Sequence, residues 1–220
     1  MTPDTIQALL EAIELKDQST AAHTWRVVLY SRALADEAGE HPDDVDRLMY
    51  AAALHDVGKL GVSGAVLSKQ GSLTEGERVA MQKHTTMGHE ILVGIGADDQ
   101  LMLDLVLQHH ERWDGLGYPN GLQGEQISVA ARRFAVVDSF DAMTSIRPYR
   151  TQVGAEAGER ALAELEAGVG TRYWGPAVES FVKLYRTGEL DWIRDHFNDL
   201  RKPPRFGPVD LADLSKTLKV

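Results

Sequence analysis

The chain has 220 residues, a formal charge of −10 and no cysteine. Its length suits one domain with a substantial core, and its acidic balance argues against binding to nucleic acid polymers, which needs a broad basic surface. Without cysteine there are no disulfides, thiolate zinc sites or cysteine nucleophiles, so any metal must be held by histidine and carboxylate ligands. No apolar run approaches the roughly 20 residues that cross a bilayer. The acidic N-terminus lacks the features of a secretory signal, so we expect a cytoplasmic protein with no membrane association.

Apolar residues recur at helical spacing along most of the chain, and alternating β patterns are scarce, which predicts an all-α fold. Thr2 can cap the first helix, and Thr74 with Glu77 forms a capping box for the fourth. We expect a first helix that begins at Pro3, a second over about 19–38, and a third over 42–59 that Gly58 and Gly61 close. A fourth helix runs from Thr74 to about Val93, and a fifth begins at Asp98 or Asp99 and carries LMLDLVLQHHERW. A sixth helix covers VAARRFAVVDSFDAMTS. The turn-rich stretch DGLGYPNGLQGEQIS precedes the last helix, and RKPPRFGP is typical of a linker.

Pairs of polar side chains stand at the ends of apolar segments. His55 and Asp56 follow an alanine-rich run, and His109 and His110 follow another apolar run. A buried charge is costly unless it is paired or bound to a metal. Adjacent side chains on a helix diverge by about 100°, so we expect each pair to flank a metal cluster from two sides rather than to chelate one ion.

Three further residues fit this interpretation. Asp138 emerges from an apolar run as His55 does, and we favour a metal ligand over a surface carboxylate. Asp141 is better placed to hold a ligand histidine or a nearby arginine. Lys59 lies one turn after Asp56 on the same helix face.

The number of candidate ligands indicates more than one ion. Imidazole and carboxylate ligands without thiolates suit Fe, Mn, Zn, Ni or Co. Five histidines and two aspartates are too many for a single ion. Two ions that share a carboxylate and a water lie roughly 3.5–4 Å apart and drive phosphoester hydrolysis. A bridging hydroxide would attack phosphorus, and a lysine or arginine would neutralise the developing charge.

The stretch after His110 suggests a ligand-binding loop. Its glycines permit close backbone approach, Tyr118 can stack on a base, and Pro119 stiffens the loop. The segment SIRPYR adds local cations, Arg147 among them, that suit phosphates. An ordinary surface loop and salt bridges to nearby carboxylates are the alternatives.

Several segments, taken together and in order, resemble the HD-GYP domains of the HD phosphohydrolase superfamily. They are ELKDQSTAAHTWRV, HDVGKLG, HHERWDGLGYPNGL, GEQIS, AARRFAVVDSFDAMTS and RPYR, and the match covers roughly residues 12 to 185. The resemblance implies an HD-domain helical bundle with a GYP-loop extension. Residues 1–200 would form the catalytic domain, and residues 201–220 a linker and C-terminal tail.

The resemblance also implies a reaction and a site. The reaction is hydrolysis of the bacterial messenger cyclic di-GMP to pGpG, GMP or both, with two divalent ions, iron or manganese. By matched position, one metal would be held by His23, His55, Asp56 and Asp138, and the second by Asp56, His84, His109 and His110. Lys59 would contact phosphate or help the leaving group, Gly117, Tyr118 and Pro119 would shape the substrate loop, and Arg132 and Arg147 would make phosphate or structural contacts. Ser19 stands where some members carry a glutamate associated with a third metal, so we expect two metals.

Two other readings stay open on the sequence alone. One is an HD hydrolase of another nucleotide or cyclic dinucleotide. The other is a weakly active or inactive module that binds a cyclic dinucleotide or a signalling protein such as a diguanylate cyclase domain. A homodimer is compatible with either.

Overall fold

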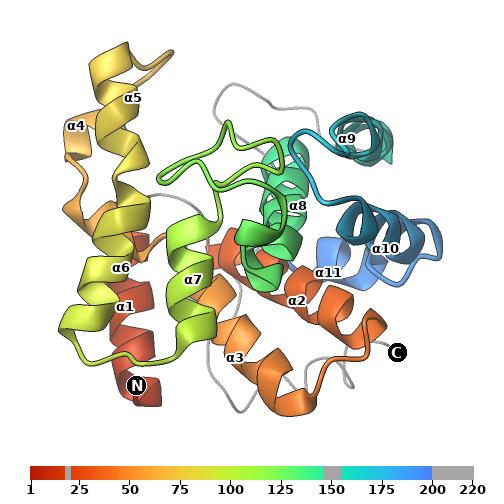
Figure 1. Cartoon of the computed structure of the whole chain (residues 1–220), viewed down its shortest axis with the longest axis horizontal. Coiled ribbons are helices and arrows are strands. Elements are labelled where there is room, and N and C mark those ends of the chain that lie inside the picture. The colour runs from red at the N-terminus through yellow and green to blue at the C-terminus, as the bar shows by residue number, and fades with distance from the viewer. Residues whose placement is uncertain (18–20, 146–154, 200–220) are drawn as a thin grey trace.

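The computed structural model describes residues 1–17, 21–145 and 155–199, and the regular structure in these ranges is helical, without a β-strand. Figure 1 shows the helices α1 (Pro3–Lys16), α2 (Ala21–Glu37), α3 (Pro42–Ala53), α4 (Gly64–Leu67), α5 (Glu75–Gln82), α6 (His84–Gly94), α7 (Gln100–Gln108), α8 (Val129–Thr144), α9 (Ala155–Ala167), α10 (Gly175–Arg186) and α11 (Asp191–His196). Two short 3-10 helices are η1 (Val57–Gly61) and η2 (Gly124–Gln126). The expected all-α fold is confirmed. Ser19, Arg147 and the expected tail at 201–220 lie outside the described residues.

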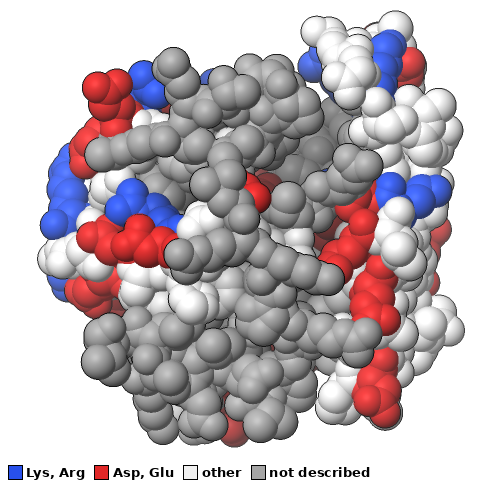
Figure 2. All heavy atoms as spheres, turned by 180° about the vertical axis from the view of Figure 1, so that it is seen from behind, with Lys and Arg blue, Asp and Glu red and all other residues white. Residues whose placement is uncertain are grey.

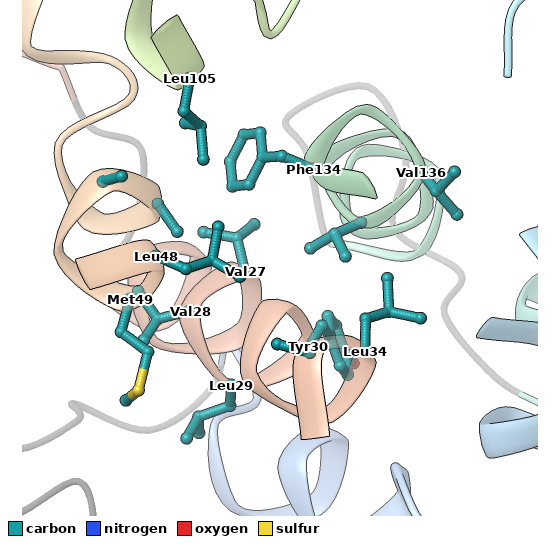
Figure 3. Packing of buried hydrophobic residues seen from close by; sticks show 14 of the residues in the cluster. Val27, Val28, Leu29, Tyr30, Leu34, Leu48, Met49, Leu105, Phe134 and Val136 are labelled. Carbon is teal, nitrogen blue, oxygen red and sulfur yellow. The ribbon is translucent and has the colours of Figure 1, made fainter. Parts of the chain in front are cut away.

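Helix α2 forms the centre of the core, and its residues from Trp25 to Ser31 are all buried. Its residues Val27 and Val28 are fully buried. Figure 3 shows α2 side chains packed against Leu48 and Met49 of α3 on one side and against Phe134 of α8 on the other. A helix that is buried on every side of its middle turns lies inside the fold. The other helices therefore assemble around α2.

An aromatic cluster joins α2, α8 and α10. The ring centroids of Tyr30 and Phe140 lie 5.8 Å apart, those of Tyr30 and Phe181 lie 5.7 Å apart, and those of Phe140 and Phe181 lie 4.8 Å apart. The first two pairs meet edge to face, which is a favoured geometry for aromatic rings. The cluster fixes α8, and with it the carboxylates that α8 carries, against α2.

The prediction of one helix over 42–59 is wrong, because the α-helix ends at Ala53. A turn carries the chain through His55 and Asp56, and η1 follows. The cause is a tertiary contact at Gly58: a Cβ atom there would lie 1.7 Å from the carbonyl oxygen of His84. The backbone of η1 therefore touches α6, and only glycine permits this approach.

Two other expected helices also end or break earlier than the sequence indicated. The capping box of Thr74 and Glu77 is present, but the helix that it begins breaks at Lys83 into α5 and α6. Helix α7 ends at Gln108, so the two histidines that follow lie in a turn. The Gln108 side chain accepts a hydrogen bond of 2.7 Å from the backbone N–H of Ser128. This bond ties the end of α7 to the start of α8.

Acidic residues outnumber basic ones by 33 to 23, which gives the net charge of −10. In Figure 2 acidic side chains form a column along the edge of the molecule where α1 lies. The α4–α5 hairpin projects from the body of the fold (Figure 1). None of the described helices is both long enough and apolar enough to cross a membrane.

Replacement of Phe181 by alanine tests the aromatic cluster. We expect Phe181→Ala to lower the free energy of unfolding by about 3–5 kcal/mol, because it removes a fully buried ring that α2 and α8 both contact. Urea unfolding at pH 7 measures the change. Leu15→Ala is the control, because Leu15 is 89% exposed and its loss should change stability by less than about 0.5 kcal/mol. Equal effects of the two variants would contradict this packing.

Candidate metal centre

Two groups of metal-type side chains lie close together where η1, α6 and the end of α7 meet. One group is His84, His109 and His110, and the other is His23, His55 and Asp56. Within each group the candidate ligand atoms all lie within 4.8 Å of one another. The rings of His55 and His109 join the two groups, with centroids 5.3 Å apart. The structure thus brings together six of the seven expected metal ligands.

Helix ends produce this convergence. The expectation that His109 and His110 diverge by about 100° is wrong, because α7 has ended before them. Their ring centroids lie 4.2 Å apart, and both side chains belong to the same group. His55 and Asp56 likewise lie in the turn that follows α3, with the His55 Nε2 atom 3.2 Å from Asp56 Oδ2.

Backbone carbonyls fix the tautomers of three histidines. The Nδ1 atoms of His55, His84 and His109 lie 2.8, 2.8 and 2.9 Å from the carbonyl oxygens of the residue three positions earlier. A carbonyl oxygen only accepts hydrogen bonds, so each Nδ1 carries a proton. The neutral rings of His84 and His109 therefore present a lone pair at Nε2.

The two lone pairs of His84 and His109 face each other. Their Nε2 atoms lie only 3.1 Å apart. Two buried acceptors at this distance repel unless a cation or a shared proton lies between them or beside them. The residues present therefore fit a divalent cation, for which neutral imidazole nitrogen is a common ligand.

Burial keeps this group neutral. Desolvation lowers the pKa of His84 and holds the pKa of His109 well below its usual range. Desolvation also lowers the pKa of His110 to about 4, against the opposing attraction of Asp138 and Asp56. All three rings are therefore unprotonated at pH 7, the state in which histidine binds a metal.

Asp56 lies between the two groups. Its Oδ2 faces His55, and its Oδ1 lies 3.5 Å from His84 Nε2. Burial alone would raise the pKa of this carboxyl, but Lys59 and His55 outweigh it and hold the pKa well below the usual range. For His55, burial alone would lower the pKa, but Asp56 outweighs it and raises the pKa. Asp56 is thus an ionised carboxylate whose two oxygens reach both groups.

Helix α8 orients His23 through Asp141. The Nδ1 atom of His23 lies 2.7 Å from Asp141 Oδ2, and its Nε2 points toward Asp138, whose Oδ1 is 4.0 Å away. Asp138 lies beside the group of His23, His55 and Asp56 but is not one of its members. Asp141 also forms an ion pair with Arg26. The prediction that Asp141 holds a histidine or an arginine is confirmed, since it holds both.

Arg26 was not anticipated from the sequence, although it lies one turn after His23 on a buried helix. Its guanidinium donates to the carbonyl oxygen of Phe197 at 2.7 Å and to Asp199 at 2.9 Å. Burial alone would lower the pKa of Arg26, but the carboxylates of Asp141 and Asp199 outweigh burial, raise the pKa and keep the guanidinium charged. The segment after α11 therefore supports the orientation of Asp141.

Lys59 lies at the site in an ion-paired state. Its Nζ atom is 2.8 Å from Asp56 Oδ2 and 2.6 Å from Asp17 Oδ2. Burial would lower its pKa, but the two carboxylates outweigh burial and raise it. The lysine is therefore a cation next to the carboxylate that joins the two groups. Asp17, at the end of α1, was not singled out by the sequence patterns.

The loop that carries Gly117, Tyr118 and Pro119, here called the GYP loop, folds back onto His110. The backbone N–H of Tyr118 donates to the carbonyl oxygen of His110 at 3.1 Å, and the two rings pack with centroids 4.8 Å apart. The Tyr118–Pro119 peptide bond is cis. At Gly117 a Cβ atom would lie 2.4 Å from the backbone nitrogen of Arg112, so the loop can approach this backbone only with glycine.

Arg132 makes structural contacts with the segment just before α8. Its guanidinium donates to the carbonyl oxygens of Ile127 and Glu125, at 2.7 Å each. It also lies 5.6 and 5.4 Å from the rings of Trp113 and Trp174. These contacts hold the turn before α8. A contact between Arg132 and phosphate stays a prediction, and Arg147 lies outside the described residues.

The chain belongs to the HD domain family, whose model matches residues 7–178. Within this family the pair His55–Asp56 and the triplet Gly117–Tyr118–Pro119 are the features of the HD-GYP branch.

Curated relatives of known name support this placement. The chain is 40% identical over 182 residues to a cyclic di-GMP phosphodiesterase of Thermotoga maritima, covering 82% of this chain and 49% of that protein. It is 38% identical over 181 residues to the cyclic di-GMP phosphodiesterase response regulator RpfG of Xanthomonas campestris, covering 82% and 47%. It is also 38% identical over 148 residues to the 3'3'-cGAMP-specific phosphodiesterase 2 of Vibrio cholerae, covering 67% and 28%. The chain thus spans about half the length, or less, of these relatives.

Solved structures share the fold. A cyclic GMP-AMP-specific phosphodiesterase of V. cholerae aligns with a TM-score of 0.66 and 16% identity, over 99% of this chain and 53% of that one. The HD domain of the L. monocytogenes phosphodiesterase PgpH, solved with cyclic-di-AMP, aligns with a TM-score of 0.57 and 18% identity, over 86% and 96%. At these identities the likeness concerns the helical architecture alone.

Asp141→Asn tests the orienting network in metal-free protein. Burial alone would raise the pKa of Asp141, but Arg26 and His23 outweigh it and hold the pKa well below its usual range. The carboxylate therefore stabilises the fold above its unfolded pKa of about 3.9, and this contribution is lost as pH falls toward the folded pKa. We expect Asp141→Asn to lower the free energy of unfolding by about 3 kcal/mol at pH 7 and by progressively less below about pH 4.

Urea unfolding at several pH values, with a chelator present, measures this difference. Asp36→Asn is the matched control, because Asp36 pairs with Arg32 on the surface and its side chain is 58% exposed. A pH-independent difference for Asp141→Asn would contradict the proposed cause of its stabilisation.

Proposed function

We propose that this chain is a metal-dependent phosphodiesterase that hydrolyses cyclic di-GMP to pGpG, GMP or both. The observation that carries the proposal is Asp56, whose two carboxylate oxygens face His55 of one group and His84 of the other. A shared carboxylate between two groups of ligands is the arrangement that two-metal phosphoesterases use. The names of the relatives from T. maritima and X. campestris support the choice of substrate.

The candidate ligands divide into two sets. One ion would be held by His23, His55, Asp56 and Asp138, and the other by Asp56, His84, His109 and His110. We infer two ions per chain, iron or manganese, since the ligands are imidazole and carboxylate without thiolate. Such ions activate water as a nucleophile and withdraw charge from a phosphoryl oxygen.

The chain's own side chains supply positioning and charge. Lys59, held beside Asp56 at 2.8 Å, can neutralise negative charge on a phosphoryl oxygen or on the departing oxygen. Tyr118 offers an aromatic face for a guanine base next to His110. Gly117 and Pro119 set the path of the loop, and Arg132 and Arg147 remain candidates for phosphate or structural contacts.

A second candidate substrate is cyclic GMP-AMP. The Vibrio cholerae relatives named for this nucleotide are 34–38% identical to the chain. A binding module with slow turnover, a diguanylate cyclase domain as partner, a homodimer and a cytoplasmic location remain predictions.

Hydrolysis by metal-loaded protein tests the proposal. Purified protein with Mn²⁺ or Fe²⁺ should convert cyclic di-GMP to pGpG or GMP, as chromatography would reveal, and elemental analysis should find about two metal equivalents per chain. Asp56→Ala should lose both ions and at least about 10²-fold in kcat, because one carboxylate serves both sets of ligands. Metal-replete protein that turns over neither cyclic di-GMP nor cyclic GMP-AMP, or an Asp56→Ala variant with full activity, would refute the proposal.

Lys59→Gln separates the role of the lysine from that of the metals. We expect kcat to fall by roughly 10²-fold, as when one stabilising donor is removed from a transition state, while the metal content stays near that of the wild type. Lys69→Gln is the control, because Lys69 pairs with Glu77 on the α4–α5 hairpin. Unchanged kcat in Lys59→Gln would leave the lysine with a structural role only.

A further inference from the structure

A buried carboxylate next to the site belongs to neither group of candidate ligands. Glu111 directly follows His110, and only 3% of its surface is exposed. Its Oε1 accepts a hydrogen bond of 2.7 Å from the backbone N–H of Asn120. Its Oε2 accepts one of 3.0 Å from the backbone N–H of Leu122. Both oxygens are therefore occupied by the loop that follows.

These two bonds close the segment from Glu111 to Leu122 into a ring that contains the GYP triplet. At one end of the triplet, Gly117 packs on the backbone of residues 110–112, with 2.6 Å between its ideal Cβ position and the carbonyl oxygen of His110. At the other end, the carboxylate holds Asn120 and Leu122. Tyr118 is thus fixed on both sides.

The energetic cost of this arrangement indicates a specific purpose. Burial of a carboxylate is unfavourable unless its oxygens are hydrogen-bonded. Bonds from backbone N–H groups to an ionised carboxylate are stronger than those between neutral groups, and they also constrain direction. Here they constrain the residues on the far side of Tyr118, whose ring lies 33° from the plane of His110 at a centroid distance of 4.8 Å.

We propose that Glu111 is a positioning residue that sets the ring of Tyr118 against His110 and so determines how strongly the site binds a base of the cyclic dinucleotide. The inference deepens the proposed function and rests on it for the substrate. A ring held at a fixed angle beside a candidate metal ligand presents one aromatic face at a defined height above the site. A mobile ring would lose binding affinity without altering the metal ligands.

Glu111→Gln tests this role with the smallest change. The amide keeps one acceptor oxygen, but its NH₂ group then opposes one of the two backbone N–H donors. We expect KM for cyclic di-GMP to rise about tenfold, the effect of weakening one base–aromatic stack, while kcat stays within about twofold and metal content is unchanged. Glu125→Gln, the same substitution at an exposed position in the nearby η2, should change none of these values.

A double-mutant cycle with Tyr118→Ala distinguishes positioning from a merely structural effect. If Glu111 acts through Tyr118, the KM of the double variant should equal that of Tyr118→Ala alone. A structural role would instead lower stability or metal content and leave KM unchanged. Additive KM effects, or a Glu111→Gln variant with wild-type KM, would overturn the proposal.

Hydrogen exchange provides a readout that does not depend on the substrate. The amides of Asn120 and Leu122 should exchange slowly in the wild type and at least about tenfold faster in Glu111→Gln, because one hydrogen bond is lost. Glu111→Asp, which keeps the charge but is too short to reach both amides, serves if the glutamine variant does not fold. Equal exchange in wild type and variant overturns the inference. Faster exchange in a protein that hydrolyses no cyclic dinucleotide would refute the proposed function and leave the loop anchor established.

Discussion

The close approach of two histidine lone pairs is the constraint on which the site depends. His84 and His109 donate from Nδ1 to backbone carbonyls, and their Nε2 atoms then face each other at 3.1 Å. In a buried environment this arrangement is unfavourable unless a cation or a shared proton lies between the two nitrogens or beside them. The two carboxylate oxygens of Asp56 connect this pair to His55, because Oδ1 faces His84 and Oδ2 faces His55. The electrostatics of the centre thus require positive charge that these neutral rings do not provide.

The rest of the fold serves to hold these groups in place. The helices α3 and α7 end just before their polar pairs, and Gly58 lets η1 contact α6 so closely that the two groups meet. The buried helix α2 and the aromatic cluster fix α8, which orients His23 through Asp141. The same logic extends outward to the loop, where Glu111 holds the backbone on both sides of a turn that covers His110.

The sequence predicted the fold class and the residues that meet, but not how they meet. Helical periodicity and the capping box of Thr74 depend on neighbours within a few positions, and both are found. The break at Ala53 depends on contact with α6, and the roles of Arg26 and Asp141 join residues 115 positions apart. Helix propensity continues smoothly through such points, so local pattern extends the helices too far. The sequence assigned no role to Glu111, which follows the histidine pair in HHERW, because a buried carboxylate that binds backbone N–H groups leaves no periodic signal.

Anomalous diffraction from crystals of manganese- or iron-loaded protein tests the central claim most directly. Data collected on both sides of the metal absorption edge should show two peaks per chain, one among His84, His109 and His110 and the other among His23, His55 and Asp138, with Asp56 between them. A single peak, or peaks remote from Asp56, would contradict a centre in which this carboxylate joins two metal ions.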